Sequence, residues 1–224
     1  MVMFQRARSE EQREARRQAI LAAAAAMLTE MPVADVTLNE LSRRSGLAKS
    51  NVLRYFESRE AVLLELLDAA WQDWLARLDS GLDGAIGRDA PVAVRSGQLA
   101  SVVAASLAAR PMLCDLLSAQ AAVLERNVSP QVAAQYKRAS IAGIGALGAS
   151  FGRHLPELGD AAAFRLAGAV VLTTAALWPH AQPSAAMLAA YEADPALAAL
   201  RLDFTATLTE LLEVLTAGLL ARPR

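Results

Sequence analysis

A run of polar and basic side chains between residues 49 and 59 carries the most distinctive chemistry in the sequence. Lys49, Ser50 and Asn51 stand in succession at the predicted start of a short helix. A lysine can reach the O6 and N7 atoms of guanine, and an asparagine can pair with adenine through two hydrogen bonds. We therefore expect these three residues to contact base edges in the major groove of duplex DNA.

The residues before this run predict a helix-turn-helix. Thr37 and Glu40 have capping-box spacing, in which the threonine hydroxyl accepts the glutamate amide and the carboxylate returns to the threonine amide. Gly46 suits the left-handed backbone that ends a helix. In the next helix Val52 and Phe56 lie four residues apart and form a candidate buried pair. This order of helix, glycine turn and helix predicts the motif that places a second helix in the major groove.

Two further helices flank the motif. Apolar residues between Arg16 and Met31 follow helical spacing, and Pro32 ends that helix. Ser58 is a candidate N-cap for a long helix that reaches Leu78. The glycine-rich stretch 80–91 is expected to break it.

The rest of the chain reads as helices separated by prolines. Helical segments are predicted at 92–109, 111–126, 129–154, 160–180 and 203–220, with an irregular or broken helix over 181–200. The composition is 54% hydrophobic and 5% aromatic, which favours closely packed helices over strands. We expect an all-α protein.

The charge distribution also favours a nucleic-acid partner. The net charge is −1, but residues 1–59 hold ten Lys or Arg against seven acids, a net charge of +3, and the remainder comes to −4. Positive charge gathered at one end is what a DNA-binding module requires, because neutralised phosphates supply most non-specific affinity. The arginines near the N-terminus form an arm that reaches DNA or, because glutamates are interleaved, a solvated helical face: Arg6, Arg8, Arg13, Arg16 and Arg17.

Several functional classes find little support in the sequence. Cys114 is the only cysteine, and His154 and His180 stand apart, so neither a disulfide nor a metal centre is expected. The chain shows no nucleophile with a base beside it and no phosphate-binding glycine loop, so we expect neither an enzyme nor a cofactor.

The sequence does not predict a membrane protein. A spanning helix needs about 20 mostly apolar residues, and the best candidate, Leu166 to Trp178, is shorter than that. The first segment is charged and unlike a secretory signal. We expect a cytoplasmic protein without a membrane partner.

Residues 37–59 closely resemble the helix-turn-helix of the TetR family of repressors. The resemblance rests on Thr37-Leu38, Leu41-Ser42 and the continuous stretch Ser45-Gly46-Leu47-Ala48-Lys49-Ser50-Asn51-Val52-Leu53-Arg54-Tyr55-Phe56, followed by Ser58-Arg59. It covers about the first quarter of the chain. The rest agrees with the family in being helical and of suitable length.

The resemblance implies an organisation and a mechanism. Residues 1–59 would form the three-helix DNA-binding domain, and residues 60–224 a helical bundle for ligand binding and dimerisation. The last two helices would pair with those of a second copy, so that a homodimer binds a palindromic operator on double-stranded DNA. An unknown small-molecule effector would release a repressor of this kind.

The resemblance also assigns candidate DNA contacts around the base-reading residues. Arg54, Tyr55 and Arg59 look like phosphate contacts, and Leu53 stands where the family usually has a tyrosine. Leucine donates no hydrogen bond, so it would contact a thymine methyl group instead. Ala48 replaces the usual capping serine. The full predicted set is Thr37, Asn39, Arg43, Arg44, Lys49, Ser50, Asn51, Leu53, Arg54, Tyr55 and Arg59.

Candidate effector-binding residues combine apolar walls with a few polar groups, as in buried small-molecule sites. Plain core is the favoured interpretation of each one alone, and the expectation is only that the site lies among these middle helices. They are Trp71, Trp74, Met112, Leu117, Gln120, Tyr136, Phe151, Leu172, Trp178 and His180, with Cys114 beside them.

Two alternatives stay open at this point. A helical-bundle enzyme without DNA binding would need a catalytic cluster that the sequence does not show. A helical protein-interaction module would account for the apolar C-terminal part but would leave the pattern at 37–59 unexplained.

Overall fold

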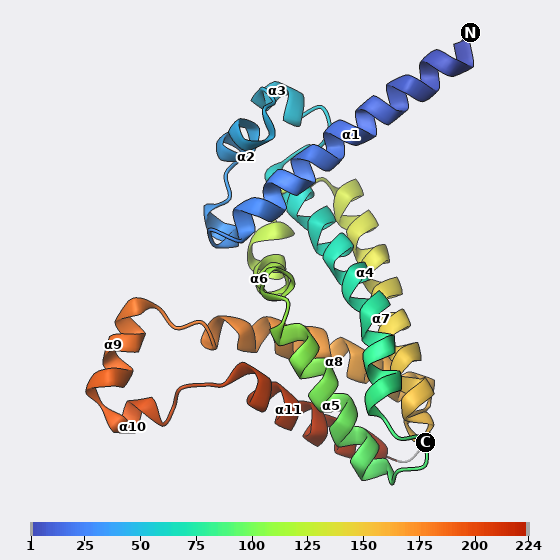
Figure 1. Ribbon diagram of the computed structural model, residues 1–224, viewed down its shortest axis with the longest axis vertical. Helices are drawn as coiled ribbons and strands as arrows, with labels where there is room; N and C mark the ends of the chain where they lie inside the picture. Colours follow the sequence, from blue (N-terminus) through green and yellow to red (C-terminus); the bar gives the residue numbers. More distant parts are fainter. Residues whose placement is uncertain (1, 223–224) are drawn as a thin grey trace. The chain divides into compact units, whose positions relative to one another are not determined.

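The computed structural model describes residues 2–222, and the side chains of residues 10–222. Helices make up its secondary structure, and the described residues contain no strand, so the predicted all-α fold class is confirmed. The chain divides into two compact units (Figure 1). Unit 1 comprises Met1–Ala69 and Ala119–Lys137, and unit 2 comprises Ala70–Ser118 and Arg138–Arg224.

Unit 1 is built around the N-terminal helices. It contains α1 (Val2–Leu28), the 3-10 turn η1 (Val33–Asp35), α2 (Leu38–Ser45), α3 (Lys49–Val52), the start of α4 (Arg59–Ala85), the π-helical turn η2 (Gln120–Leu124) and the start of α7 (Pro130–His154). Its buried apolar side chains include Ile20, Ala24, Met27, Leu41, Val52, Phe56, Val62, Leu63 and Leu124. Both predicted helices of the turn motif are therefore present, with their apolar faces in one core.

Unit 2 holds the remaining helices. They are α5 (Val92–Ala108), α6 (Pro111–Ala119), the 3-10 turn η3 (Pro156–Leu158), α8 (Gly159–His180), α9 (Ala185–Ala193), α10 (Pro195–Ala198) and α11 (Phe204–Leu220). Helix α11 packs on α5 and on α8. Trp178 meets Phe204 edge-on at a centroid distance of 5.0 Å, so the end of α8 lies beside the start of α11 and the two helices run antiparallel.

Two helices extend beyond their predicted limits. Helix α1 begins at Val2, well before Arg16, and α4 continues to Ala85 through two glycines that were expected to break it. A glycine inside a helix costs about 1 kcal/mol relative to alanine. Leu78 and Leu82 are buried on the same face of α4, and their burial offsets that cost.

Residues 181–203, which we call the arm, confirm the expected broken helix. The arm holds α9 and α10, and neither helix buries a residue. Figure 1 shows both helices projecting beyond the adjoining ends of α8 and α11.

Among the helices that the structure describes, a single unbroken one is long and apolar enough to cross a membrane by length and composition. It runs from Pro156 to His180, longer than the sequence suggested, because η3 and α8 are continuous. Its inward side chains include Leu166, Ala167 and Val170, which are buried in unit 2. Core helices of this kind pass the same test.

Helices α4 and α7 approach closely where Trp71 faces Gly143. A Cβ atom at residue 143 would overlap the indole nitrogen of Trp71 and lie 2.9 Å from its Cδ1 atom. The Trp71 side chain is buried and stacks edge-on against Trp74 at 4.8 Å.

Replacing Gly143 with alanine should therefore destabilise the protein. We expect Gly143→Ala to lower the free energy of unfolding by about 1–3 kcal/mol in urea denaturation, as overpacked cores do. Gly145→Ala is the matched control, because a Cβ atom at residue 145 meets nothing within 4 Å. It should be neutral or stabilising by up to about 1 kcal/mol. Equal losses in the two variants would contradict this account of the contact.

Candidate nucleic-acid interface

The turn between α2 and α3 has the local geometry that the sequence predicts. The Thr37 hydroxyl accepts the Glu40 amide at 3.2 Å and caps α2. Gly46 adopts a left-handed conformation with φ of 67° and ends the helix. The Ser42 hydroxyl donates to the Leu47 carbonyl at 2.6 Å and ties the turn together. These bonds fix the direction in which the chain enters α3.

Helix α3 presents its polar side chains outward. Val52 and Phe56 are buried as predicted, at 0% and 4% exposure. Lys49, Ser50 and Asn51 are exposed on the opposite side. Because one face of a short helix is held in the core, its other face is presented as a unit.

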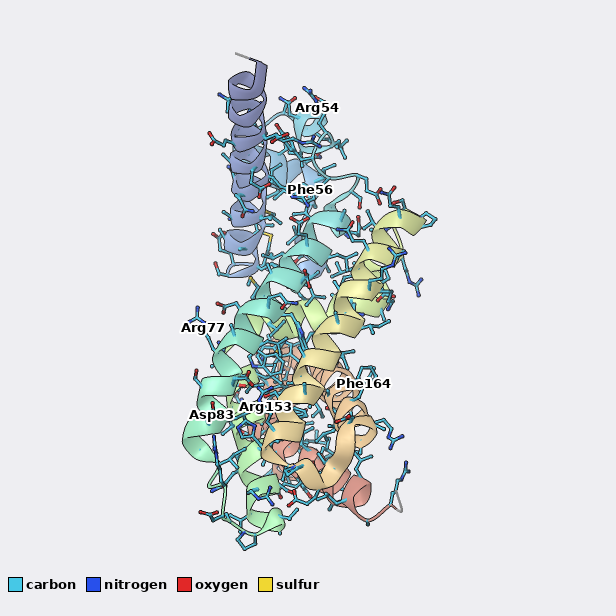
Figure 2. All side chains as sticks on the ribbon, turned by 90° about the vertical axis from the view of Figure 1, so that its right-hand side faces the viewer. Arg54, Phe56, Arg77, Asp83, Arg153 and Phe164 are labelled. Carbon is cyan, nitrogen blue, oxygen red and sulfur yellow. The ribbon has the colours of Figure 1, made fainter. Side chains whose placement is uncertain are left out.

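The turn that follows α3 continues this surface. Arg54 is exposed, Leu53 is 42% exposed and Tyr55 is half-buried. In Figure 2 the Arg54 side chain extends away from the helices, whereas Phe56 lies among them. Ala48 makes no side-chain cap, as expected, and the helix has a single turn from Lys49 to Val52.

The supporting helix α2 carries two arginines that share one carboxylate. Arg43 and Arg44 both donate to Glu40, the latter at 2.7 Å, and Arg44 also pairs with Glu30 at 2.7 Å. These hydrogen bonds from the two arginines lower the pKa of Glu40 to about 2. The glutamate carboxylate therefore binds the arginines rather than closing the predicted capping box. Arg43 remains 70% exposed at its side chain, and Thr37 and Asn39 are exposed beside it.

The Arg59 side chain is held by hydrogen bonds within unit 1. It donates to the carbonyls of Ala34 and Val36, at 3.2 and 2.6 Å, and to the Glu60 carboxylate at 2.8 Å. Burial raises the pKa of Glu60, but hydrogen bonds from Arg59, from the backbone and from Asn127 outweigh it and leave the pKa below its ordinary value. A phosphate contact by Arg59 would compete with these bonds.

Arg17 has a role in positioning the site that its sequence context did not assign. It pairs with Glu65 of α4, and its guanidinium lies 4.6 Å from the Phe56 ring centroid. Arg17 thus holds α1, α4 and the buried anchor of α3 together. It does not belong to the DNA-reaching N-terminal segment that the sequence allowed. Its position one turn before Ile20, on the apolar face of α1, is the signal that could have revealed this role. The side chains of Arg6 and Arg8 lie outside the described residues.

The candidate effector residues are distributed over both units. Gln120 and Tyr136 belong to unit 1, and the other eight belong to unit 2. Most are buried or half-buried, but Leu172 is 73% exposed and His180 is also exposed. Both lie on the outer face of α8, so the structure does not place them in the interior of unit 2 as a buried site would require.

Within unit 2 two of the three tryptophans make specific polar contacts. Trp74 donates to Ser106 at 2.9 Å, and Trp178 donates to Asp115 at 2.6 Å. The indole nitrogen of Trp71 and the hydroxyl of Thr174 are buried without a hydrogen-bond partner among the described residues. Buried polar groups normally have partners. These two groups are therefore candidates to bind a ligand.

A charged cluster joins the ends of α4 and α7, near Asp83 and Arg153 in Figure 2. Asp79 accepts hydrogen bonds from Ser150 and Arg153, and His154 contacts Asp83 at 3.1 Å. The other ring nitrogen of His154 donates to the Ser150 carbonyl, not to the hydroxyl. These bonds do not form the serine–histidine relay that activates a nucleophile.

Metal and thiol chemistry find no site in the part of the chain that is described. No group of three or more His, Cys, Asp or Glu side chains is placed there to hold a metal ion. Cys114 is buried, and burial raises the pKa of its thiol to about 12.

Comparison with known families decides what this arrangement is. Residues 20–66 match the bacterial regulatory proteins of the tetR family, and residues 68–223 match the tetracyclin repressor-like, C-terminal domain. The chain belongs to the TetR family. It is a transcriptional regulator with a helix-turn-helix DNA-binding domain and a ligand-binding C-terminal domain.

Relatives with similar sequence match over short stretches. Fifty residues are 44% identical to the HTH-type transcriptional regulator EthR of Mycobacterium tuberculosis (strain ATCC 25618 / H37Rv), covering 22% of this chain and 23% of that protein. Over 71 residues the identity to EthR of Mycolicibacterium smegmatis is 37%, covering 32% of this chain and 31% of that protein. The matches thus span less than a third of the length of these relatives.

Solved structures share the fold over nearly the whole chain. A TetR transcriptional regulator from Rhodococcus sp. RHA1 has a TM-score of 0.57 at 16% identity, with 95% of this chain and 100% of that chain covered. The fatty acid degradation regulator FadR from Bacillus halodurans has a TM-score of 0.53 at 15% identity, with 92% and 99% covered.

Arg17 yields a test of how the TetR-type motif is held. Burial raises the pKa of Glu65 even with Arg17 beside it, so Arg17→Met should raise that pKa further. An ionised carboxylate with a raised pKa destabilises the folded state above its unfolded pKa of about 4.3, and protonation removes the effect. We expect Arg17→Met to cost about 1 kcal/mol of unfolding free energy at pH 7, and less as the pH falls toward 4.

Two further variants make this test specific. Arg13→Met removes an exposed arginine from the same helix and should leave stability unchanged. Adding Glu65→Gln to Arg17→Met should recover part of the loss at pH 7. A deficit for Arg17→Met that is the same at every pH, measured against the unmodified protein, would show that the ion pair is not what holds the anchor.

Proposed function

We propose that this TetR-family protein is a repressor that binds a palindromic operator as a homodimer and is released by a small-molecule effector. The observation that carries the proposal is the surface of α3, where Lys49, Ser50 and Asn51 are exposed while Val52 and Phe56 are held in the core. A helix anchored in this way can enter a major groove without changing its own packing.

The predicted contacts divide into two groups. Lys49, Ser50 and Asn51 open α3 and would read base edges. Arg54 and Arg43 would bind phosphates, together with the amide end of α2 at Thr37. Leu53 is exposed enough to contact a thymine methyl group. In this proposal residues 1–59 form the DNA-binding domain, and the remaining residues bind the effector and the second subunit.

The outer face of α8 and α11 supports the dimer. Leu172 of α8 is 73% exposed, and Val214 of α11 is 63% exposed. A groove of about 300 Å³ runs between the two helices, lined by Ala169, Leu215 and Gly218 among others. Exposed apolar surface of this kind, shared by two antiparallel helices, suits packing against the same two helices of a second copy.

Dimerisation determines which DNA is recognised. A two-fold axis would present two copies of α3, and successive major grooves on one face of B-DNA lie about 34–36 Å apart. The operator should therefore be a palindrome with that spacing between half-sites. An effector that changes the separation of the two α3 helices would lower the affinity for it.

The effector and the operator would act through one linked equilibrium. An effector that weakens DNA binding must itself bind DNA-bound protein more weakly, by a coupling free energy of typically 1–3 kcal/mol. The buried indole nitrogen of Trp71 and the hydroxyl of Thr174 are two of the buried polar groups of unit 2 without a described partner, and in this proposal they would orient such a ligand. The apolar side chains around Trp74 and Phe151 would supply its walls.

DNA binding can be tested at α3. The double variant Lys49→Ala/Arg54→Ala should bind a duplex from the region upstream of the protein's own gene at least about 100-fold more weakly, because each subunit loses two contacts. Fluorescence anisotropy over a range of salt concentrations measures this. Arg77→Ala is the control, since it removes an exposed arginine of α4 that pairs with Asp73 in unit 2. Unchanged binding by the double variant, with its fold intact, would refute the assignment of α3.

The dimer can be tested on the outer face of α8. Leu172→Asp would place an unpaired charge in the proposed interface, where its desolvation is costly. We expect the variant to elute as a monomer in size-exclusion chromatography with light scattering. Val94→Asp is the control, because Val94 is also an exposed apolar residue, at 48%, but belongs to α5 and not to α8 or α11. A Leu172→Asp protein that remains dimeric at micromolar concentration would show that α8 and α11 do not form the interface.

A further inference from the structure

The arm, residues 181–203, lacks the packing that short helices require. Of its 23 residues, 15 are Ala, Leu, Met or Tyr, yet α9 and α10 bury none. Met187 is 46% exposed and Leu200 is 73% exposed. Isolated helices of fewer than about 12 residues are marginal in water even when rich in alanine. Helix α9 has nine residues, so it needs a surface to cover it.

The arm nevertheless has defined helix starts. The Ser184 hydroxyl caps α9 through the Met187 amide at 3.3 Å, and Asp194 caps α10 through the Ala196 amide at 2.8 Å. Asp203 caps α11 at its exit through the Ala206 amide, at 2.7 Å. These caps favour the helical conformation locally. An apolar element with this organisation is suited to dock as helices.

A matching apolar groove lies at the opposite end of α8. It has a volume of about 640 Å³ and lies between α7 and α8, with Gly148, Ala149, Ala161 and Phe164 in its lining. Phe164 is 44% exposed there and is visible on the surface in Figure 2. The small residues leave room for another helix to approach closely. Asp160 and Arg165 also line the groove and could pair with Arg201 and Glu192 of the arm.

One subunit cannot bring its own arm to this groove. The arm leaves α8 at His180, and the groove lies beside the first two turns after Gly159. The 22 residues of α8 span about 33 Å at 1.5 Å per residue. A two-fold axis crossing the middle of α8 reverses the partner's α8, so that each arm emerges beside the other subunit's groove.

We propose that the arm of each subunit docks in the α7–α8 groove of its partner. This proposal rests on the dimer proposed above and adds a reciprocal exchange at both ends of the interface. The groove is filled by a second copy of this chain. The same two-fold axis that forms the dimer would bury the apolar helices α9 and α10 and fill the groove. Each dimer would then contain two equivalent arm-to-groove contacts.

Cross-linking tests the placement. Met187→Cys on the arm and Ala149→Cys in the groove introduce thiols at two exposed positions. Buried Cys114 stays in the protein, since it is inaccessible. A short bifunctional maleimide should convert most of the double variant into a covalent dimer on a denaturing gel. Each single variant should run as a single chain on the same gel. In the proposed dimer the two arms lie far from each other, and so do the two grooves.

Mixed dimers show whether the link joins two subunits. Tagged Met187→Cys protein mixed with untagged Ala149→Cys protein should give a cross-linked species containing both chains. Met187→Cys combined with Val94→Cys is the control and should give none, because Val94 lies on α5 outside the groove.

The outcomes separate the two proposals. A double variant that light scattering shows to be monomeric would refute the dimer itself. A dimeric double variant that fails to cross-link would overturn only the arm exchange. Cross-linking of Met187→Cys alone would also overturn it, by showing that the two arms meet each other instead of the grooves.

Discussion

The orientation of α3 depends on the burial of Val52 and Phe56, and Arg17 of α1 covers the Phe56 ring. Helix α3 has four residues, so its own backbone hydrogen bonds could not hold it in place. The ring of Phe56 is covered by a guanidinium that Glu65 neutralises. One aromatic side chain thus links α1 and α4 to the exposed face of α3. A cation–π contact of this kind is stronger when water is excluded, and here the Arg17 side chain is 34% exposed, so the shielding is partial.

The helix-turn-helix was predictable because its determinants are local. Thr37 and Ser58 act as N-caps and Gly46 ends α2, each through bonds that span five residues or fewer. The roles of Arg17 and Arg59 were not predictable in the same way, because their partners lie 48 and up to 25 residues away. The position of Arg17 on the apolar face of α1 sets it apart from its charged neighbours, but nothing near it in the sequence identifies Glu65 as its partner.

Residue type predicted the apolar interior of the C-terminal helices but not the direction of each side chain. Leu172 and Trp178 are both apolar residues of α8, yet Leu172 faces outward and Trp178 is buried. Six residues separate them, which turns a helix by about 600° and leaves them on different faces. The helical phase of α8 is set by its packing on α11, through Trp178 and Phe204. That contact and the buried stripe through Leu166 and Val170 distinguish the core face of α8 from its exposed face.

Helix α8 therefore takes part in several contacts at once. Its inner stripe packs on α11, its outer stripe exposes Leu172, and its two ends carry the arm and the groove. Where a second copy covers the outer stripe and the arm, the same contacts that form the dimer complete the folding of α9. Stability and assembly are then linked by mass action, and the helices of the arm become more stable as the protein concentration rises. In the proposed dimer, which would hold two recognition helices at a fixed spacing, this linkage means that a subunit with an uncovered arm would also lack the partner needed to span two major grooves.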